Sequence, residues 1–243
     1  MKFTPALVPA IFLRRYKRFM ADVRLEDGSE ITVHCPNTGS MRHCLVPESP
    51  CFVLDSQNPK RKYRHTWELA SASPEGWAGV NTARANPLVA EALERGWIAE
   101  LTGYPVIKRE QKYGDEGSRI DFLLLGSEGE QCFVEVKSVT LAAGGGAGLF
   151  PDAVSERGAK HLRELISVVA AGNRAVLLFC VQHTAIEQVS PADQIDPVYG
   201  QTLRSALAAG VEVLAYGVRY TPQLPQAPES VVLDRPLAVR VPD

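Results

Sequence analysis

The chain has 243 residues, and its 45% hydrophobic content is enough for a packed core and argues against intrinsic disorder. Its formal net charge of -2 at pH 7 and its pI near 6.2 exclude a protein that binds nucleic acid through overall charge. Local charge differs, because residues 1–80 carry 11 Lys and Arg against 8 Asp and Glu. The N-terminal third is therefore the better candidate for contact with nucleic acid.

The start of the chain does not have the pattern of a secretory signal. Its basic cluster RRYKR follows the apolar run FTPALVPAIFL, and two prolines interrupt that run. No apolar run reaches transmembrane length, and the five cysteines are an odd number without CxxC spacing, which suggests free thiols. We therefore expect a cytoplasmic protein without membrane contact. The sequence indicates no obligate protein partner.

Short extended runs separated by Gly, Pro, Asp or Asn turns fill residues 6–80, and Asp27-Gly28 is a hairpin signal. This punctuation is typical of a small β-barrel, although periodicity alone also allows another small β-fold. Two clusters in this region place an aromatic residue among cations, a mixture that can contact phosphates and stack on bases. The alternative is a set of solvated loop residues that keep the protein soluble. The clusters are Arg14, Arg15, Tyr16, Lys17 and Arg18, and Lys60, Arg61, Lys62, Tyr63 and Arg64.

The pattern of short extended runs ends near residue 81, and apolar residues follow at helical spacing over 86–101. Gly96 is expected to stop or cap this helix. We place a domain boundary here, which gives a barrel domain at 1–81 and a second domain at 82–243.

Two apolar runs, 120–125 and 132–140, are joined by the polar link GSEGEQ and predict a β-hairpin. Each run carries charge where a strand should have none: Asp121 in the first, and Glu135 and Lys137 in the second. Since side chains alternate across a strand, Glu135 and Lys137 share one face, and the hairpin can bring Asp121 beside them.

Charges in apolar strands are costly unless they pair or bind a metal. Two close carboxylates favour a divalent cation, and Mg²⁺ commonly uses one or two carboxylates while keeping several waters. Lys137 would then orient the attacking water or stabilise charge on a phosphate during metal-assisted phosphodiester hydrolysis. The alternative is a salt bridge between a carboxylate and Lys137 on a solvated hairpin face.

The segment AAGGGAG after the hairpin is expected to form a flexible loop, because consecutive glycines cost the most to order. A helix is predicted within 152–171, where Arg157, Lys160 and His161 lie away from the apolar stripe and are available to phosphate. Glu156 and Glu164 bracket Lys160 at i,i+4 spacing, which favours a surface salt-bridge ladder instead.

The remainder alternates between strands and helices. The run RAVLLFCVQ predicts a strand covered on both faces, a helix follows at 197–210, and VEVLAYGVRY predicts another strand. The segment 221–230 is rich in proline and resembles a linker, and a last short strand is expected after it. This order suits a mixed α/β sheet.

The D…ExK pattern resembles the catalytic core of the PD-(D/E)xK nuclease superfamily, in which an Asp on one strand and E-x-K on the next bind metal and act on phosphate. Asp121, Glu135 and Lys137 match it, with Ile120 in place of the superfamily's Pro. A helix before that core can supply a further acid, and Glu91 is our choice for that role. Its alternative is an ordinary exposed helix glutamate.

Beyond this motif, the chain resembles the sugar fermentation stimulation protein A family. That resemblance implies an N-terminal OB-fold, a PD-(D/E)xK restriction-endonuclease-like α/β domain, and DNA binding as the family's recorded activity. The segments that carry it are CPNTGSM (35–41), SRIDFLL (118–124), VEVKSVTL (134–141) and FPDAVSERGAKHLREL (150–165).

Two hypotheses follow from these patterns. The first is a DNA-binding protein with a nuclease centre that depends on Mg²⁺ or Mn²⁺, in which Asp121 and Glu135 hold the metal. Its substrate is DNA, with RNA and branched or single-stranded forms left open. The alternative is a non-catalytic, largely sequence-nonspecific DNA-binding regulator of sugar fermentation genes of the maltose type. An enzyme acting directly on a sugar phosphate is disfavoured, because no sugar-site chemistry is recognisable.

Overall fold

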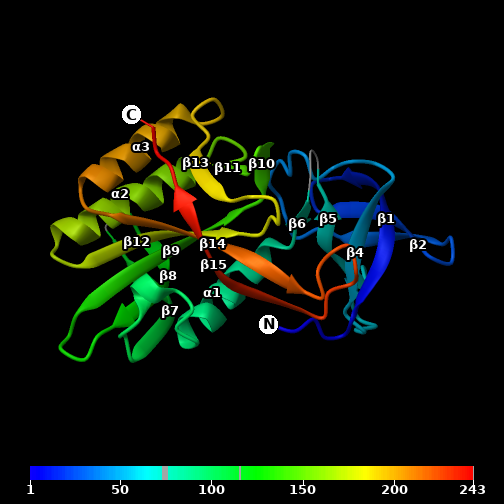
Figure 1. The fold of residues 1–243 in the computed structure, drawn as a ribbon, viewed down its shortest axis with the longest axis horizontal. Coiled ribbons are helices and arrows are strands. Elements are labelled where there is room, and N and C mark those ends of the chain that lie inside the picture. Colours follow the sequence, from blue (N-terminus) through cyan, green and yellow to red (C-terminus); the bar gives the residue numbers. More distant parts are fainter. Residues whose placement is uncertain (73–75, 115, 243) are drawn as a thin grey trace.

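The computed structural model describes residues 1–72, 76–114 and 116–242. Within these residues the chain forms two β-sheets, one of six strands and one of nine, which lie at the right and left of Figure 1. The first sheet contains the N-terminal third of the chain. The second carries helices on both faces, so the predicted mixed α+β architecture is confirmed.

The six-stranded sheet closes into a barrel with strand order β3-β2-β1-β4-β5-β6, because β3 also pairs with β5 at His34 and Thr66. Its core contains Phe12 and Trp67, whose ring centroids are 4.7 Å apart in a stacked arrangement. The strands lie close to the runs predicted from the sequence. They are β1 (Leu7–Tyr16), β2 (Met20–Leu25), β3 (Glu30–His34), β4 (Ser49–Asp55), β5 (His65–Ser71) and β6 (Trp77–Gly79).

The nine-stranded sheet has the order β10-β11-β13-β15-β14-β12-β9-β8-β7. Strands β9, β12 and β14 are parallel, and β12 is almost completely buried, as its continuous apolar run predicts. The strands are β7 (Val106–Tyr113), β8 (Ser118–Leu125), β9 (Gln131–Val139), β10 (Leu141–Gly144), β11 (Ala147–Phe150), β12 (Arg174–Val181), β13 (Gln188–Pro191), β14 (Glu212–Thr221) and β15 (Ser230–Val239).

Three α-helices within the described residues cover this sheet. Helix α1 (Ala85–Glu94) packs into one apolar cluster, whereas α2 (Glu156–Ala170) and α3 (Pro197–Ala208) pack into another on the opposite face (Figure 1). Short 3-10 helices η1 (Thr82–Arg84) and η2 (Ala99–Leu101) flank α1. The sequence predicts one helix over 86–101, but α1 ends at Glu94, and Gly96 has the left-handed φ of 67° that suits a helix stop.

The glycine-rich segment differs from its prediction. Instead of a flexible loop, it forms the hairpin of β10 and β11, with Gly145 and Gly146 at positive φ in the turn. The glycines are therefore used for the tight reversal that non-glycine residues disfavour. The last strand, β15, has ten residues rather than a few, because it pairs along most of β14.

Contacts between the two sheets begin at the N-terminus. The backbone N–H of Phe3 donates to the carbonyl of Glu229, and Phe3 packs in the same apolar cluster as α1. Near the passage from barrel to α1, the buried Glu68 accepts hydrogen bonds from Asn81 and Arg84. This ion pair stabilises the connection between the barrel and α1, and the domain boundary near residue 82 stays a prediction.

Candidate active site

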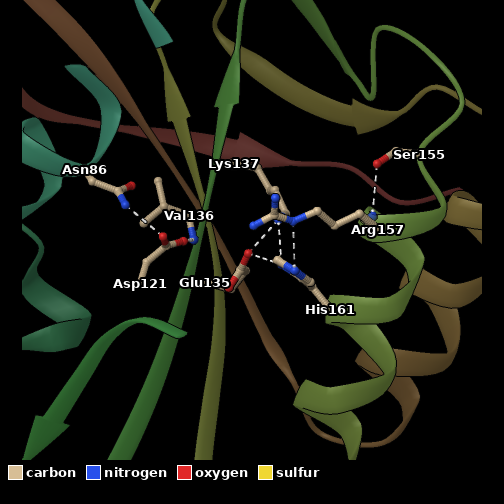
Figure 2. A network of polar contacts seen from close by, with 9 residues as sticks. Asn86, Asp121, Glu135, Val136, Lys137, Ser155, Arg157 and His161 are labelled. Carbon is tan, nitrogen blue, oxygen red and sulfur yellow. Dashed lines mark hydrogen bonds and ion pairs between the residues drawn. The ribbon is translucent and has the colours of Figure 1, made fainter. Parts of the chain in front are cut away.

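The site lies where β8 and β9 separate. The two strands pair from Leu125 and Gln131 as far as Phe122 and Val134, and the register ends there. Beyond that point, the Asp121 carboxylate accepts hydrogen bonds from the Val136 N–H and the Asn86 side chain, each at 2.7 Å (Figure 2). Asp121 thus satisfies a backbone donor that would otherwise lose its partner.

Glu135 faces α2 from β9 and is 2% exposed. Its Oε1 accepts from Lys137 Nζ at 2.6 Å and from His161 Nδ1 (Figure 2). Arg157 Nε lies 3.3 Å from His161 Nε2 and can only donate, so the neutral ring carries its proton on Nδ1. His161 on α2 therefore donates to Glu135 from Nδ1, while Lys137 Nζ, which lies 3.1 Å from that nitrogen, is held by its own hydrogen bond to Glu135.

The two carboxylates differ in their electrostatics. Burial raises the pKa of Asp121, and the neighbouring charge of Glu135 adds to that increase. Burial would also raise the pKa of Glu135, but the hydrogen bond from His161 and the charge of Lys137 outweigh it, so the pKa of Glu135 is lowered. Without a bound cation, the repulsion between the two acids thus raises the pKa of Asp121, while Glu135 stays ionised.

The donor set suits a hard divalent cation. Glu135 Oε2 is buried and has no hydrogen-bond partner, which is energetically unfavourable for a carboxylate oxygen. This oxygen is therefore available to coordinate a metal ion. No group of three or more His, Cys, Asp or Glu that could hold a metal occurs in the described parts of the chain. A cation held here would rely on two carboxylates and water, which is the coordination that Mg²⁺ tolerates.

The structure does not bring Glu91 into this cluster. Its carboxylate pairs with the N-terminal ammonium of Met1. Asn86 is the α1 residue that contacts Asp121, and a separation of five residues turns Glu91 roughly 140° away around the helix. The expectation that Glu91 supplies a further acid is therefore corrected in favour of the neutral Asn86.

Helix α2 also differs from its prediction. His161 and Glu164 are 5% and 3% exposed, and Glu164 accepts a hydrogen bond from the Glu116 backbone N–H. Lys160 donates to the Glu116 carbonyl, so no salt-bridge ladder forms. The missed signal is a second stripe, because Arg157, His161 and Glu164 recur at helical spacing among apolar neighbours. Asn86 gave no comparable signal.

Closure of the barrel brings the two predicted basic clusters together. Tyr16 pairs with Met20, Met20 with His34, and His34 with Thr66 at the start of β5. Burial lowers the pKa of His34, and the positive charge of Arg61 also lowers it. Arg61 therefore lies near the point where β3 and β5 close the barrel. The β1–β2 turn and the β4–β5 loop therefore flank one edge of the barrel.

The members of these clusters have two kinds of environment. Four make internal contacts: Arg14 and Arg64 pair with Asp22 and Asp55, Tyr16 bonds to Asp22 and Thr32, and Arg15 donates to backbone carbonyls of 18, 37 and 39. Tyr63 is half-buried, with Lys62 over its ring. The exposed cations without an ion pair among the described residues are Lys17, Arg18, Lys60, Arg61 and Lys62.

The β1–β2 turn has two further features. Lys17 and Arg18 have φ values of 49° and 63°, in a region that non-glycine residues seldom occupy. Phe19 is 47% exposed beside them. The ring of Phe19 is therefore accessible at this edge of the barrel, and no motif in the sequence points to it.

The CPNTGSM loop connects this end of the barrel to α2. Ser40 Oγ donates to the Asp152 carboxylate at 2.9 Å, and the Met41 N–H donates to it at 3.2 Å. Asp152 lies three residues before Ser155, whose side chain caps α2 by accepting from the Gly158 N–H. The CPNTGSM loop is thus a contact between the barrel and the second domain.

Comparison with known proteins gives consistent matches over the whole chain. Family models match the SfsA N-terminal OB domain over residues 13–80 and the sugar fermentation stimulation protein RE domain over residues 83–224. Sugar fermentation stimulation protein homologs are similar: that of Teredinibacter turnerae is 66% identical, over 88% of this chain and 91% of its own, and that of Saccharophagus degradans is 60% identical, over 90% and 93%.

A solved structure, titled as Pyrococcus furiosus SfsA in complex with Ca²⁺, is similar with a TM-score of 0.85. It is 29% identical, and the match covers 99% of this chain and 98% of that one. No helix among the described residues is long and apolar enough to cross a membrane. The chain belongs to the SfsA family, with an N-terminal OB domain followed by the SfsA RE domain.

Proposed function

We propose that the protein binds DNA and hydrolyses its phosphodiester bonds with the help of Mg²⁺ or Mn²⁺. The observation that carries this proposal is the meeting of Asp121, Glu135 and Lys137 at the end of the β8–β9 register, with Glu135 Oε2 buried and unpartnered. A divalent cation held by the two carboxylates would activate water and neutralise charge on the phosphate.

The chain's own residues have separate roles in this reaction. Asp121 and Glu135 would hold the cation, with Asn86 and His161 fixing their orientations. Lys137 Nζ would donate to a non-bridging phosphate oxygen, where negative charge grows as water attacks. A water oxygen forms a new bond to phosphorus as that water releases a proton to solvent, the bond to the leaving sugar oxygen breaks, and that oxygen takes up a proton from solvent.

Two observations support the binding of a divalent cation by this protein. The relative from Pyrococcus furiosus has been described in complex with Ca²⁺, another hard cation that takes oxygen ligands. In addition, burial raises the pKa of Asp121 and the nearby charge of Glu135 adds to the increase, and a cation would relieve that repulsion. The five cysteines are free and buried, and we keep a cytoplasmic location as part of the proposal.

DNA binding is assigned to the edge of the barrel that carries the unpaired cations and Phe19. Phosphate contacts and stacking on aromatic rings work with any base, so we expect weak sequence preference. A single sequence bound far more tightly than scrambled competitors at the same salt concentration would contradict this.

The test is incubation with duplex, single-stranded and branched DNA and with RNA, in Mg²⁺, Mn²⁺ or EDTA, followed by analysis of the products. The wild type should cleave at least one substrate in a divalent cation and none in EDTA. Asp121→Asn and Glu135→Gln should lose cleavage while retaining DNA binding. Glu91→Gln is the matched acidic control and should cleave normally.

One observation favours the non-catalytic alternative. Asp121 already accepts two protein hydrogen bonds, and Glu135 Oε1 is already paired with Lys137 and His161, so most polar atoms of the site have partners within the protein. A protein that keeps this fold only to bind DNA, as a regulator of sugar fermentation genes, would show the same network. Absence of cleavage with every substrate and both metals, together with intact DNA binding, would favour this alternative.

A further inference from the structure

Several arginines at the surface of this protein have a carboxylate partner. Arg24 pairs with Glu48, for example, and Arg219 pairs with Asp234. Other exposed cations form no ion pair with any described residue. Five of them lie on the barrel edge, and four lie on the β7–β8 ribbon, defined as residues 106–113 and 118–125. The others are Lys2, Arg42, Arg95, Arg157 and Arg240.

The ribbon carries four exposed cations: Lys108, Arg109, Lys112 and Arg119. None has a salt bridge within the described residues, although Arg109 lies over the buried Phe122 ring at 5.7 Å. The ribbon's two carboxylates do not neutralise them, since Asp121 is held by Asn86 and the Val136 N–H, and Glu110 forms no ion pair among the described residues.

Lys112 and Arg119 are direct cross-strand partners. Directly opposed residues of an antiparallel pair point to the same face, with Cβ atoms about 5 Å apart, and like charges there destabilise the sheet. The arrangement therefore costs stability in the free protein unless an anion lies between the two side chains. Arg119 is also only two residues before Asp121 on the same strand, which places this charge pair beside the metal ligands.

We propose that the β7–β8 ribbon, with Lys112 and Arg119 at its centre, is a second contact surface for the DNA phosphate backbone. This rests on the proposed function and deepens it. The ribbon is the edge of the nine-stranded sheet, and Figure 1 shows it on the left with the barrel on the right. A DNA substrate would therefore contact the barrel edge and the ribbon on either side of the catalytic groups.

The test measures DNA affinity in EDTA, where cleavage cannot contribute. Fluorescence anisotropy with labelled duplex and single-stranded DNA of random sequence gives the slope of log affinity against log salt. Lys112→Gln together with Arg119→Gln should weaken binding and flatten the slope by about 1.8 for duplex, or about 1.4 for a single strand. The matched control is Arg24→Gln with Arg219→Gln, which removes two positive charges that already have partners, and its slope should change by much less.

Stability separates a binding role from a structural one. Removing two opposed like charges should leave the free protein as stable as the wild type or more stable, while DNA binding falls. Should the double variant be poorly folded, Arg119→Lys keeps the charge and should retain the wild-type slope, whereas Arg119→Gln should not.

An unchanged salt slope for the ribbon variant, or a change no larger than that of the control pair, would overturn the proposal. Failure of the wild type to cleave DNA would leave this binding result unaffected, because the assay contains no divalent cation. A preference for duplex over single strand in the lost affinity would show which form of DNA the ribbon contacts.

Discussion

The barrel edge and the β8–β9 junction both place charge at the end of strands, but they stabilise it in opposite ways. At the barrel edge, Lys17, Arg18 and Lys60 are exposed and have no ion pair among the described residues. At the junction, Glu135 is almost completely buried and is paired with Lys137 and His161. The first arrangement suits long-range attraction of a polyanion, and the second suits strong local interactions in a low dielectric.

This difference predicts how each region responds to salt and to mutation. Exposed charges are screened within about 8 Å at physiological ionic strength, whereas buried pairs are screened much less. Substitutions at the barrel edge should therefore change DNA affinity in a salt-dependent way. Substitutions at the junction should change catalysis and metal binding, with little effect on the salt dependence of DNA binding.

After loss of the acidic ligands, the largest expected effect is from Lys137→Met, which keeps most of the length of the side chain and removes the ammonium. Loss of a charge-stabilising donor from a buried site should lower the cleavage rate by about 10²–10³-fold. DNA affinity measured in EDTA should change little. A variant that cleaves at the wild-type rate would exclude Lys137 from the reaction.

His161→Ala should have a smaller effect, because His161 positions Glu135, to which Lys137 is also bonded, rather than contacting the substrate. Groups that orient metal ligands typically contribute about 10–100-fold to metal affinity or activity. The readout is the Mg²⁺ concentration that gives half-maximal cleavage, which should rise. Arg163→Ala, on the exposed face of α2, is the control and should leave this concentration unchanged.

Asp121 should give the metal-free protein a characteristic pH dependence. Its pKa is raised in the folded state, so stability is lost as pH rises from the ordinary value of 3.8 through the folded value. The wild type should lose stability relative to Asp121→Asn across that window, by about 1.4 kcal/mol for each unit by which the pKa is raised. Urea unfolding in EDTA at several pH values measures this difference.

Glu135 has the opposite sign, because its pKa is lowered. Its contribution to stability is present above its ordinary pKa of 4.5 and is lost as pH falls through the pKa of the folded state, so Glu135→Gln should destabilise the metal-free protein at neutral pH.

For the Asp121 prediction, parallel curves of stability against pH for the wild type and Asp121→Asn would contradict the assignment of the repulsion to Asp121.

The smallest effect concerns the strained turn. Lys17→Gly should stabilise the protein by about 1 kcal/mol, since glycine adopts the left-handed conformation without the steric cost that lysine bears. DNA affinity should fall because a cation is lost. Lys17→Ala removes the same charge but keeps the strain, so it should weaken binding equally without raising the unfolding midpoint; equal stability of the two variants would argue against strain.

Much of the fold was predictable because it is encoded locally. The barrel strands follow alternating apolar runs between turn residues, and β12 follows its continuous apolar run. The glycine hairpin of β10 and β11 could not be predicted locally, because β11 forms a strand only by pairing with β13. A partner that is distant in sequence leaves no local pattern.

The candidate site shows the same division. Asp121, Glu135 and Lys137 stand out because charges interrupt apolar strands. Asn86 and His161 do not, because their roles arise only when α1 and α2 pack on opposite faces of the sheet. The helical pattern around Glu91 indicates the correct helix, but only the packing geometry shows that Asn86, not Glu91, faces Asp121.

The central claim is that Asp121 and Glu135 hold a divalent cation, and calorimetric titration of Mn²⁺ and Mg²⁺ into the wild type and the Asp121→Asn and Glu135→Gln variants tests it most directly. The wild type should bind the cation and gain thermal stability with increasing concentration, as expected for a ligand of the native state. Both variants should bind at least about tenfold more weakly. A wild type that binds neither cation, with or without DNA, and whose unfolding midpoint does not move would contradict the claim.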